Sequence, residues 1–256
     1  MEAYRNARAK FFAAIQRAKS VSVGSSGVLS TAYQMFYSSV LFTRLVVTGI
    51  SIQKLLPDDD PKAHWDFSAV ASITRNLSEC YLVQYFLCFD DIDKDEEEAR
   101  FLMMHLHDHN TRRKMLSEFE PNNADFGDSS DAVQADLVDR ISKTRHFNSL
   151  SEKKQRELIR GEKPPFVQDE VLERMGIDRN GFRGLYRLFS AHTHSGPMAF
   201  YRMADQGRGG GVENPVDIEY MVIALEFATD VIQRATVAML KIFPNAENRG
   251  ARILDK

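Results

Sequence analysis

The densest group of side chains that could do chemistry lies near residue 190, in the sequence GLYRLFSAHTHSGP. If this segment is helical, successive residues rotate by about 100° around its axis. Arg187, Ser190 and His194 then lie along one face, and His192 points away from Arg187. His194 is expected at the helix end, where the dipole stabilises an imidazolium. Because a guanidinium binds two phosphate oxygens while an imidazole moves a proton near neutral pH, the spacing favours phosphate chemistry.

A structural role is the alternative for the same three side chains. A histidine and a serine at a helix end often cap backbone carbonyls, and an arginine beside them often pairs with a buried carboxylate. The two interpretations differ in whether these three side chains are accessible to solvent. A working site needs the guanidinium, hydroxyl and imidazole in a wet cleft, whereas a structural cluster holds each of them against a protein partner.

A line of polar side chains crosses an otherwise apolar segment, SAVASITRNLSECYLVQYF. Ser68, Ser72, Arg75 and Glu79 recur in it at helical spacing. Burying charges is expensive unless they are paired, so Arg75 and Glu79 are expected to form an ion pair at i, i+4. Alternatively, Glu79 orients the arginine or the histidine of the late segment from across the protein. The two roles are compatible.

A third pattern is HLHDHNTRR, in which His105 and His109 share a helix face and form half of a zinc site. Asp108 reaches the same point only from an adjacent face, and no further ligand is in register. A solvated, charge-rich helix face explains the pattern as well. We therefore predict no metal and no cofactor.

The glycine-rich segment DQGRGGG, residues 205–211, has neither the lysine nor the strand-to-helix context of a phosphate-binding loop. It is predicted to be a flexible linker, with a mobile lid as the alternative. Arg202 and Arg208 are expected near the candidate site, where Arg202 would help to bind a ligand.

Helical periodicity extends over most of the 256 residues, and no segment alternates like a strand between hairpin turns. We therefore predict an all-α fold, an antiparallel helix bundle with a small helical insertion, in a single domain over residues 1–256. Core helices are expected within about 2–119 and 179–243, and the insertion at about 120–178. The expected helices are about 2–19, 30–56, 67–89, 93–119, 130–145, 151–160, 168–176, 179–194 and 215–243.

The charge and the cysteines limit the classes of function. A net charge of −3 argues against a non-specific nucleic-acid binder, although a local basic patch would be compatible with it. Cys80 and Cys88 lie in an apolar run, which favours a reducing compartment. The first residues lack a signal-peptide core, and the longest apolar stretch, 40–52, contains Arg44, which is costly in lipid. A cytoplasmic protein with no membrane contact is therefore expected.

The chain resembles a set of bacterial helical proteins of unknown function over about residues 30–243. Those proteins share an R-x3-E element in an early apolar helix and a late Y-x3-S-x3-H element. The matching residues here are Arg75, Glu79, Tyr186, Ser190 and His194.

The R-x4-H spacing from Arg187 to His192 and the R-x6-H spacing from Arg187 to His194 also resemble the motif of the HEPN superfamily (higher eukaryotes and prokaryotes nucleotide-binding domains). This resemblance implies an all-helical bundle, a homodimer, and a role in toxin–antitoxin or phage-defence systems. It also implies metal-independent cleavage of RNA in a cleft shared by two subunits. His194 would be the general base and Arg187 the phosphate clamp, with His192 as substitute or helper.

Two functions follow from these patterns. The first is a metal-independent ribonuclease that acts on RNA phosphodiesters through the arginine–histidine pair. The second is a non-catalytic module that binds a nucleotide, another phosphate ligand or a partner protein. The acidic net charge favours the second, as does Leu188, because nuclease members commonly have a polar residue after the arginine. Metal-dependent hydrolysis through His105 and His109 is a third hypothesis.

Overall fold

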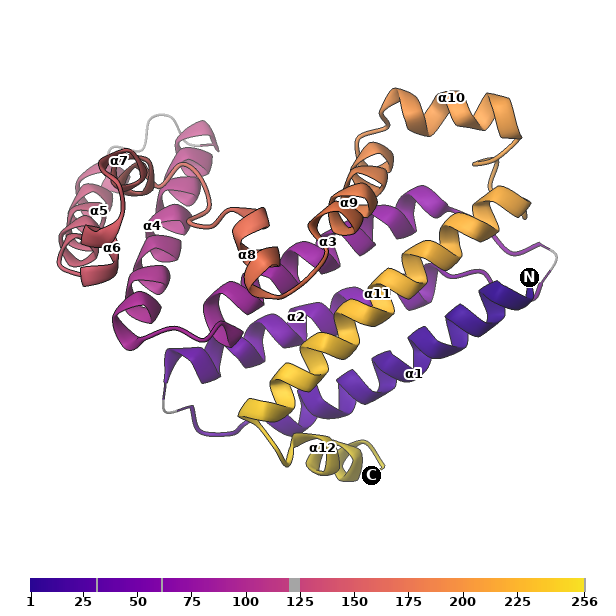
Figure 1. The fold of residues 1–256 in the computed structure, drawn as a ribbon, viewed down its shortest axis with the longest axis horizontal. Coiled ribbons are helices and arrows are strands. Elements are labelled where there is room, and N and C mark those ends of the chain that lie inside the picture. Colours follow the sequence, from indigo (N-terminus) through magenta and orange to yellow (C-terminus); the bar gives the residue numbers. More distant parts are fainter. Residues whose placement is uncertain (31, 61, 120–124, 256) are drawn as a thin grey trace. The chain divides into compact units, whose positions relative to one another are not determined.

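The computed structural model describes residues 1–30, 32–60, 62–119 and 125–255, without the side chains of 125–129, 202, 204 and 205. The described residues contain helices and no strand, so the predicted all-α fold is confirmed (Figure 1). A single β-bridge joins Trp65 to Gly211. The helices are α1 (Glu2–Ser25), α2 (Tyr33–Leu55), α3 (Phe67–Gln84), α4 (Lys94–Phe119), α5 (Asp125–Ser142), α6 (Arg145–Ser149), α7 (Glu152–Arg160), α8 (Gln168–Arg174), α9 (Arg179–Thr193), α10 (Pro197–Gln206), α11 (Pro215–Ile242) and α12 (Ala246–Leu254), with a π-helical turn, η1 (Tyr85–Phe89), after α3.

The chain divides into two compact units. The first comprises Met1–Phe89 and Met175–Lys256, and the second comprises Asp90–Arg174. The boundary differs from the expected insertion at 120–178, because α4 packs against α5, α6 and α7 rather than within the first unit. The reason is the apolar face of α4, on which Leu102 and Leu106 are buried in the core of the second unit.

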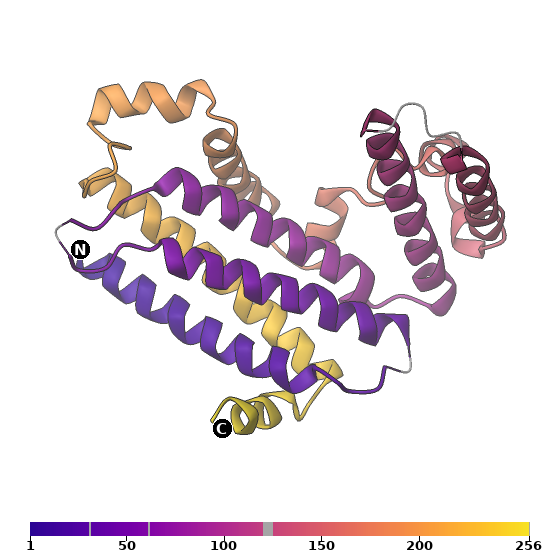
Figure 2. The ribbon, with the colours of Figure 1, turned by 180° about the vertical axis from the view of Figure 1, so that it is seen from behind.

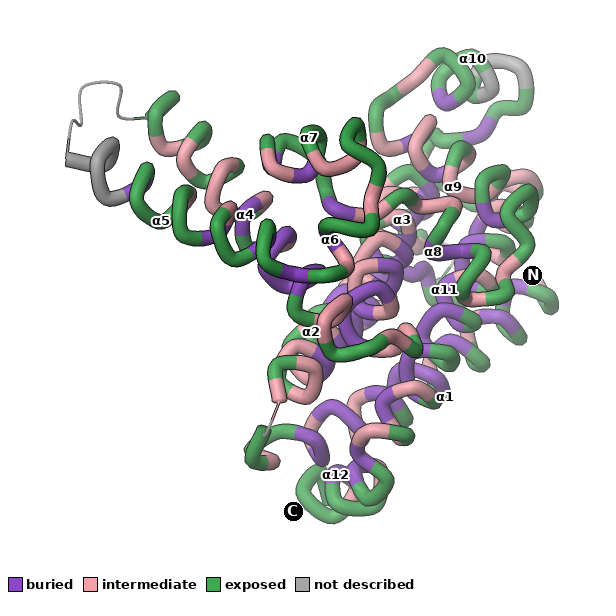
Figure 3. Tube along the Cα trace, turned by 60° about the vertical axis from the view of Figure 1, so that its left-hand side comes forward, coloured by how far each residue is buried: buried purple, intermediate pink, exposed green. Residues whose placement is uncertain are grey.

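In the first unit, α1, α2, α3 and α11 form a bundle, α12 packs on α1, and α9 packs on α3 (Figures 1 and 2). Buried residues line the inward faces of the bundle helices (Figure 3). Aromatic and aliphatic side chains fill this core, among them Phe11, Phe42 and Ile232, each with no exposed surface. Asp66 caps α3 by accepting a hydrogen bond from the backbone amide of Ala69 at 2.9 Å.

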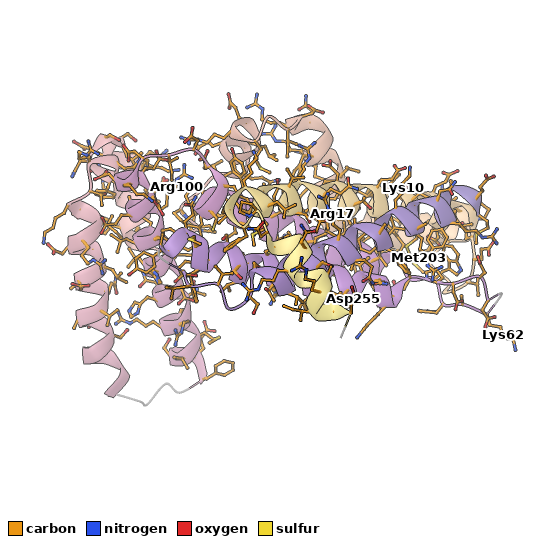
Figure 4. The ribbon with its side chains drawn as sticks, turned by 90° about the horizontal axis from the view of Figure 1, so that it is seen from below. Lys10, Arg17, Lys62, Arg100, Met203 and Asp255 are labelled. Carbon is orange, nitrogen blue, oxygen red and sulfur yellow. The ribbon has the colours of Figure 1, made fainter. Side chains whose placement is uncertain are left out.

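The crossing of α1 and α12 depends on two glycines. A Cβ on Gly24 would lie 1.8 Å from the carbonyl oxygen of Ala246, and a Cβ on Gly250 would lie 1.7 Å from that of Ser20. The two backbones therefore approach as closely as only glycine permits. Nearby, Arg17, labelled in Figure 4, forms a two-pronged ion pair with Glu247 of α12 at 2.9 and 3.1 Å.

Within the described part of the chain, α2 is the one helix long and apolar enough to cross a membrane. The helix packs against α1, α3 and α11, and 39% of its most apolar window is buried inside the protein. Less than half of this window is buried, so the core helix expected from the interrupting Arg44 stays a prediction. The cytoplasmic location stays a prediction.

The second unit has a charged cluster beside its core. Arg100 of α4, labelled in Figure 4, has a side chain that is 4% exposed and contacts Asp90 at 2.7 Å and Glu96 at 2.5 Å. Arg174 also reaches Asp90, at 2.8 Å. Paired charges of this kind hold the two ends of the unit's chain together.

Three short helices, α6, α10 and α12, were not expected from the sequence. The SGP segment ends α9 as expected, with Ser195 at φ +48°, but it also starts a new helix. Gly196 is the N-cap of α10 and Pro197 occupies its first turn, where the missing N–H is no loss.

Candidate functional site

The α9 helix lies along α3, and contacts from its middle and from its C-terminal end define an antiparallel register. At the middle of α9, Tyr186 contacts Arg75 and Glu79, and at its C-terminal end His192 contacts Ser68. The polar line expected on α3 therefore faces α9. We call the strip between these contacts the α3–α9 seam.

The first contact of the seam is a cluster of three polar side chains. Arg75 pairs with Glu79 at 2.8 Å, which confirms the predicted i, i+4 ion pair. The hydroxyl of Tyr186 donates to Glu79 Oε1 at 2.5 Å and accepts from Arg75 Nη2 at 2.8 Å. Burial and the hydrogen bond to Glu79 raise the pKa of Tyr186. Within the described residues, Glu79 has no contact with Arg187 or with His194.

Arg187 and His194 are both exposed, and no side chain in the described residues pairs with either. His194 is the C-cap of α9, and its backbone amide donates to the carbonyl oxygen of Ser190 at 3.1 Å. Ser190 is half-buried, and its Oγ is a buried atom without a hydrogen-bonding partner. Since their helical spacing places all three on one side of α9, we call them the Arg187–His194 face. The guanidinium and the imidazole are accessible to solvent.

His192 occupies a different environment from His194. It is 5% exposed, its Nδ1 lies 3.1 Å from Ser68 Oγ, and its ring meets Phe67 edge-on at 4.7 Å. Burial, together with the charge of Arg208, lowers the pKa of His192 to about 4. The imidazole is therefore neutral at physiological pH, with Nε2 buried and unpaired. It faces α3 rather than Arg187, which leaves His194 as the histidine on the arginine's side.

A pocket of about 170 Å³ lies beside His192. It is formed by the start of α3, the end of α9, α10, the glycine-rich loop and the start of α11. The residues that line this His192 pocket are His64, Trp65, Asp66, Phe67, Ser68, His192, Ala199, Met203, Arg208, Gly209, Gly211 and Asp217. Neither Arg187 nor His194 is among them.

The glycine-rich segment was predicted to be a flexible linker, and this prediction is wrong for its central residues, Arg208 and Gly209. Arg208, with a side chain 3% exposed, donates through Nε to Asp217 at 3.1 Å and lies 4.3 Å from the ring centre of Tyr220. The backbone amide of Gly209 donates to the other oxygen of Asp217 at 2.7 Å. The loop is therefore anchored to the first turn of α11. The side chain of Arg202, expected to bind ligand, lies outside the described residues.

Sequence reasoning missed the roles of Trp65, Arg208 and Asp217 in this pocket. The available signal was Asp217 itself, an acidic residue that begins a long apolar helix. Such a buried carboxylate needs a cation, and Arg208 is the arginine of the preceding loop.

Buried polar atoms without partners gather along the α3–α9 seam. Arg75 Nε, Ser190 Oγ and His192 Nε2 belong to this group. Folded proteins satisfy most such atoms, and those left over often mark a site for water, a ligand or catalysis. The seam is therefore one candidate region for function, and the exposed Arg187–His194 face of α9 is the other.

The histidines of α4 belong to the second unit and have other contacts. His109 Nε2 lies 3.1 Å from Ser130 Oγ, and His107 Nδ1 lies 2.9 Å from the carbonyl oxygen of Gly161. The described residues bring no three His, Cys, Asp or Glu side chains together at a geometry for metal binding.

Comparison of the chain with curated proteins and with solved structures finds no match. A family model does match residues 35–211, which include α3, α9, α10 and most of the His192 pocket. This match covers more than half of the chain. The chain therefore belongs to the family of unknown function DUF5677.

Proposed function

We propose that the protein is a metal-independent, HEPN-like ribonuclease that cleaves RNA phosphodiesters at the Arg187–His194 face. The observation that carries the proposal is that both side chains are exposed and have no partner among the described residues. A structural cluster would hold the guanidinium on a carboxylate and the imidazole on a carbonyl. These two groups are instead accessible to an anionic substrate.

In the proposed reaction, neutral His194 accepts the proton of a ribose 2′-hydroxyl, whose oxygen attacks the adjacent phosphorus. The bond from phosphorus to the 5′-oxygen breaks, and that oxygen leaves with a proton from water. The products are a 2′,3′-cyclic phosphate and a 5′-hydroxyl end. Arg187 binds the non-bridging oxygens, where negative charge grows in the transition state, and the C-terminal dipole of α9 stabilises the imidazolium.

RNA cleavage in the presence of a metal chelator tests this proposal. Wild-type protein should produce cyclic phosphate ends, and His194→Ala should lower the rate by about 10²-fold or more because general-base catalysis is lost. Arg187→Ala should lower it as well, by removing a charge-assisted contact. His105→Ala, on the exposed surface of the second unit, is the matched control and should keep the wild-type rate. Cleavage that persists undiminished in His194→Ala would refute the mechanism.

The HEPN resemblance further implies a homodimer, in which the Arg187–His194 faces of two subunits would form one cleft. An open helix face gives a phosphodiester contact from one side only, whereas a shared cleft would enclose it. We therefore expect the mass of a dimer in light scattering at micromolar concentration. A monomeric mass, together with full activity, would show that one chain suffices.

A non-catalytic module that binds a nucleotide or another phosphate ligand is the second candidate. It is favoured by Leu188, which is partly buried against the core where nuclease members commonly have a polar residue, and by the position of the His192 pocket away from Arg187. Calorimetry with a panel of nucleotides separates the two functions. Saturable binding without turnover would favour the module over the ribonuclease.

A further inference from the structure

The lining of the His192 pocket is mixed, with four apolar side chains, Trp65, Phe67, Ala199 and Met203, among polar and charged ones. Trp65 and Phe67 are each 3% exposed, and Met203, labelled in Figure 4, contributes a polarisable thioether. A cavity of about 150 Å³ with apolar walls holds one benzene ring. The volume of about 170 Å³ therefore matches a single planar ring.

One polar atom of a residue that lines the pocket has no partner. His192 Nε2 is buried, while Nδ1 of the same ring is already engaged by Ser68 at 3.1 Å. An unsatisfied buried polar atom costs about 1–3 kcal/mol, so a ligand that bonds to Nε2 recovers part of this free energy. Because the pKa of His192 is lowered to about 4, the ring offers a hydrogen bond without a charge.

The charged groups that line the pocket are two carboxylates, Asp66 and Asp217, and one guanidinium, that of Arg208. Both oxygens of Asp217 accept hydrogen bonds, from Arg208 and from the amide of Gly209, and Asp66 uses Oδ1 to cap α3. The ion pair neutralises Arg208 where an anion would otherwise bind. The pocket therefore suits a neutral ligand better than an anion.

We propose that the His192 pocket binds one neutral planar ring with a hydrogen-bonding edge, the chemistry shared by pyrimidine bases and aromatic amides such as nicotinamide. His192 Nε2 bonds to the polar edge of the ring, and Trp65 and Phe67 contact the rest of it. This site is separate from the Arg187–His194 face. The proposal goes beyond RNA cleavage and holds whether or not the chain is a ribonuclease.

Trp65 is the only tryptophan of the chain and lines the pocket, so its fluorescence reports binding directly. The full chain should be titrated with uracil, nicotinamide and benzene, with excitation where the ligands do not absorb. Uracil or nicotinamide should give a saturable change, and benzene should bind at least about tenfold more weakly because it lacks the edge for His192. Tighter binding of uracil would identify a pyrimidine base as the ligand class, and tighter binding of nicotinamide would identify an aromatic amide.

His192→Phe tests the polar contact, because a phenyl ring keeps the packing on Phe67 and removes Nε2. It should weaken binding by about tenfold, as expected for one hydrogen bond. His194→Phe changes an exposed residue of the same helix and is the matched control, which should bind like wild type. Ala199→Leu, which fills the pocket from α10, should abolish binding, and thermal unfolding checks that each variant is folded.

Equal affinity for benzene and for the polar rings would overturn the proposal, as would wild-type affinity in His192→Phe or the lack of saturation by both polar rings. These outcomes are distinct from failure of the proposed ribonuclease. RNA cleavage is lost through His194, whereas ring binding is lost through His192, and either can fail while the other persists.

Discussion

Removing the charge of Asp217 should destabilise the first unit strongly. The side chains of Arg208 and Asp217 are 3% and 2% exposed, so solvent screens neither of them. Breaking a buried ion pair by removing one partner costs about 3–5 kcal/mol, because the remaining charge is left uncompensated. In Asp217→Asn, the amide oxygen still accepts the hydrogen bond from Gly209. The free energy of unfolding is therefore expected to fall by about 3 kcal/mol, the lower end of this range.

Urea unfolding followed through Trp65 measures this loss, since that side chain belongs to the first unit and lines the same pocket. Asp230→Asn is the matched control. Asp230 also lies on α11 and pairs with Arg234 at 2.7 Å, but those side chains are 56% and 48% exposed. The Asp230→Asn substitution should lower the free energy of unfolding by less than about 1 kcal/mol. Equal losses in the two variants, or a loss below about 1 kcal/mol in Asp217→Asn, would show that the loop anchor is not a buried ion pair in solution.

Three further predictions concern packing, protonation and the seam. Gly250→Ala should cost about 1–3 kcal/mol in urea unfolding and expose α12 to proteolysis, because its Cβ meets the backbone of α1 at 1.7 Å, whereas Gly184→Ala, which meets nothing within 4 Å, should be neutral or stabilising. Because folding lowers the pKa of His192 from 6.5 to about 4, the unfolded chain binds the proton more tightly, and stability falls by about 3 kcal/mol as pH drops through this window. That part of the pH dependence, which comes mainly from burial of the ring and also from the charge of Arg208, should vanish in His192→Phe, and an imidazole that titrates near 6.5 by NMR would contradict it. Glu79→Ala should cost only about 1 kcal/mol by thermal unfolding, because Glu79 is 41% exposed, and a loss of several kcal/mol would instead indicate a buried pair.

Much of the helical architecture is predictable from local patterns. The long helices have apolar periodicity and clear ends, such as the Asp66 cap of α3 and Pro215 in the first turn of α11. The short helix α12 was missed because its place depends on the close approach of Gly24 and Gly250, which are far apart in the sequence. The second unit was expected to begin too late in the chain, because the pattern of α4 shows that it has an apolar face but not which helices cover that face.

In the candidate site, too, contacts between residues close in the sequence were predictable and contacts between distant residues were not. The Arg75–Glu79 pair was predictable because both residues lie one turn apart on a single helix. The His192 pocket was not, because it joins the ends of α3 and α9 to the loop that precedes α11. Helical spacing within α9 gives the direction of His192 relative to Arg187, but it does not give the side chains that meet it.

The two histidines of α9 illustrate what helical spacing does decide. They are two residues apart, so they point about 200° apart around the axis, and one of them must face α3 if the other faces solvent. His192 is accordingly buried, with a pKa of about 4, and His194 is exposed at the helix end. A neutral, packed imidazole suits ligand recognition, and an exposed imidazole on the same side of the helix as an exposed guanidinium suits proton transfer at a phosphate. The two proposals therefore assign different histidines to different chemistry, and they predict that substitutions of His192 and of His194 change ring binding and RNA cleavage independently.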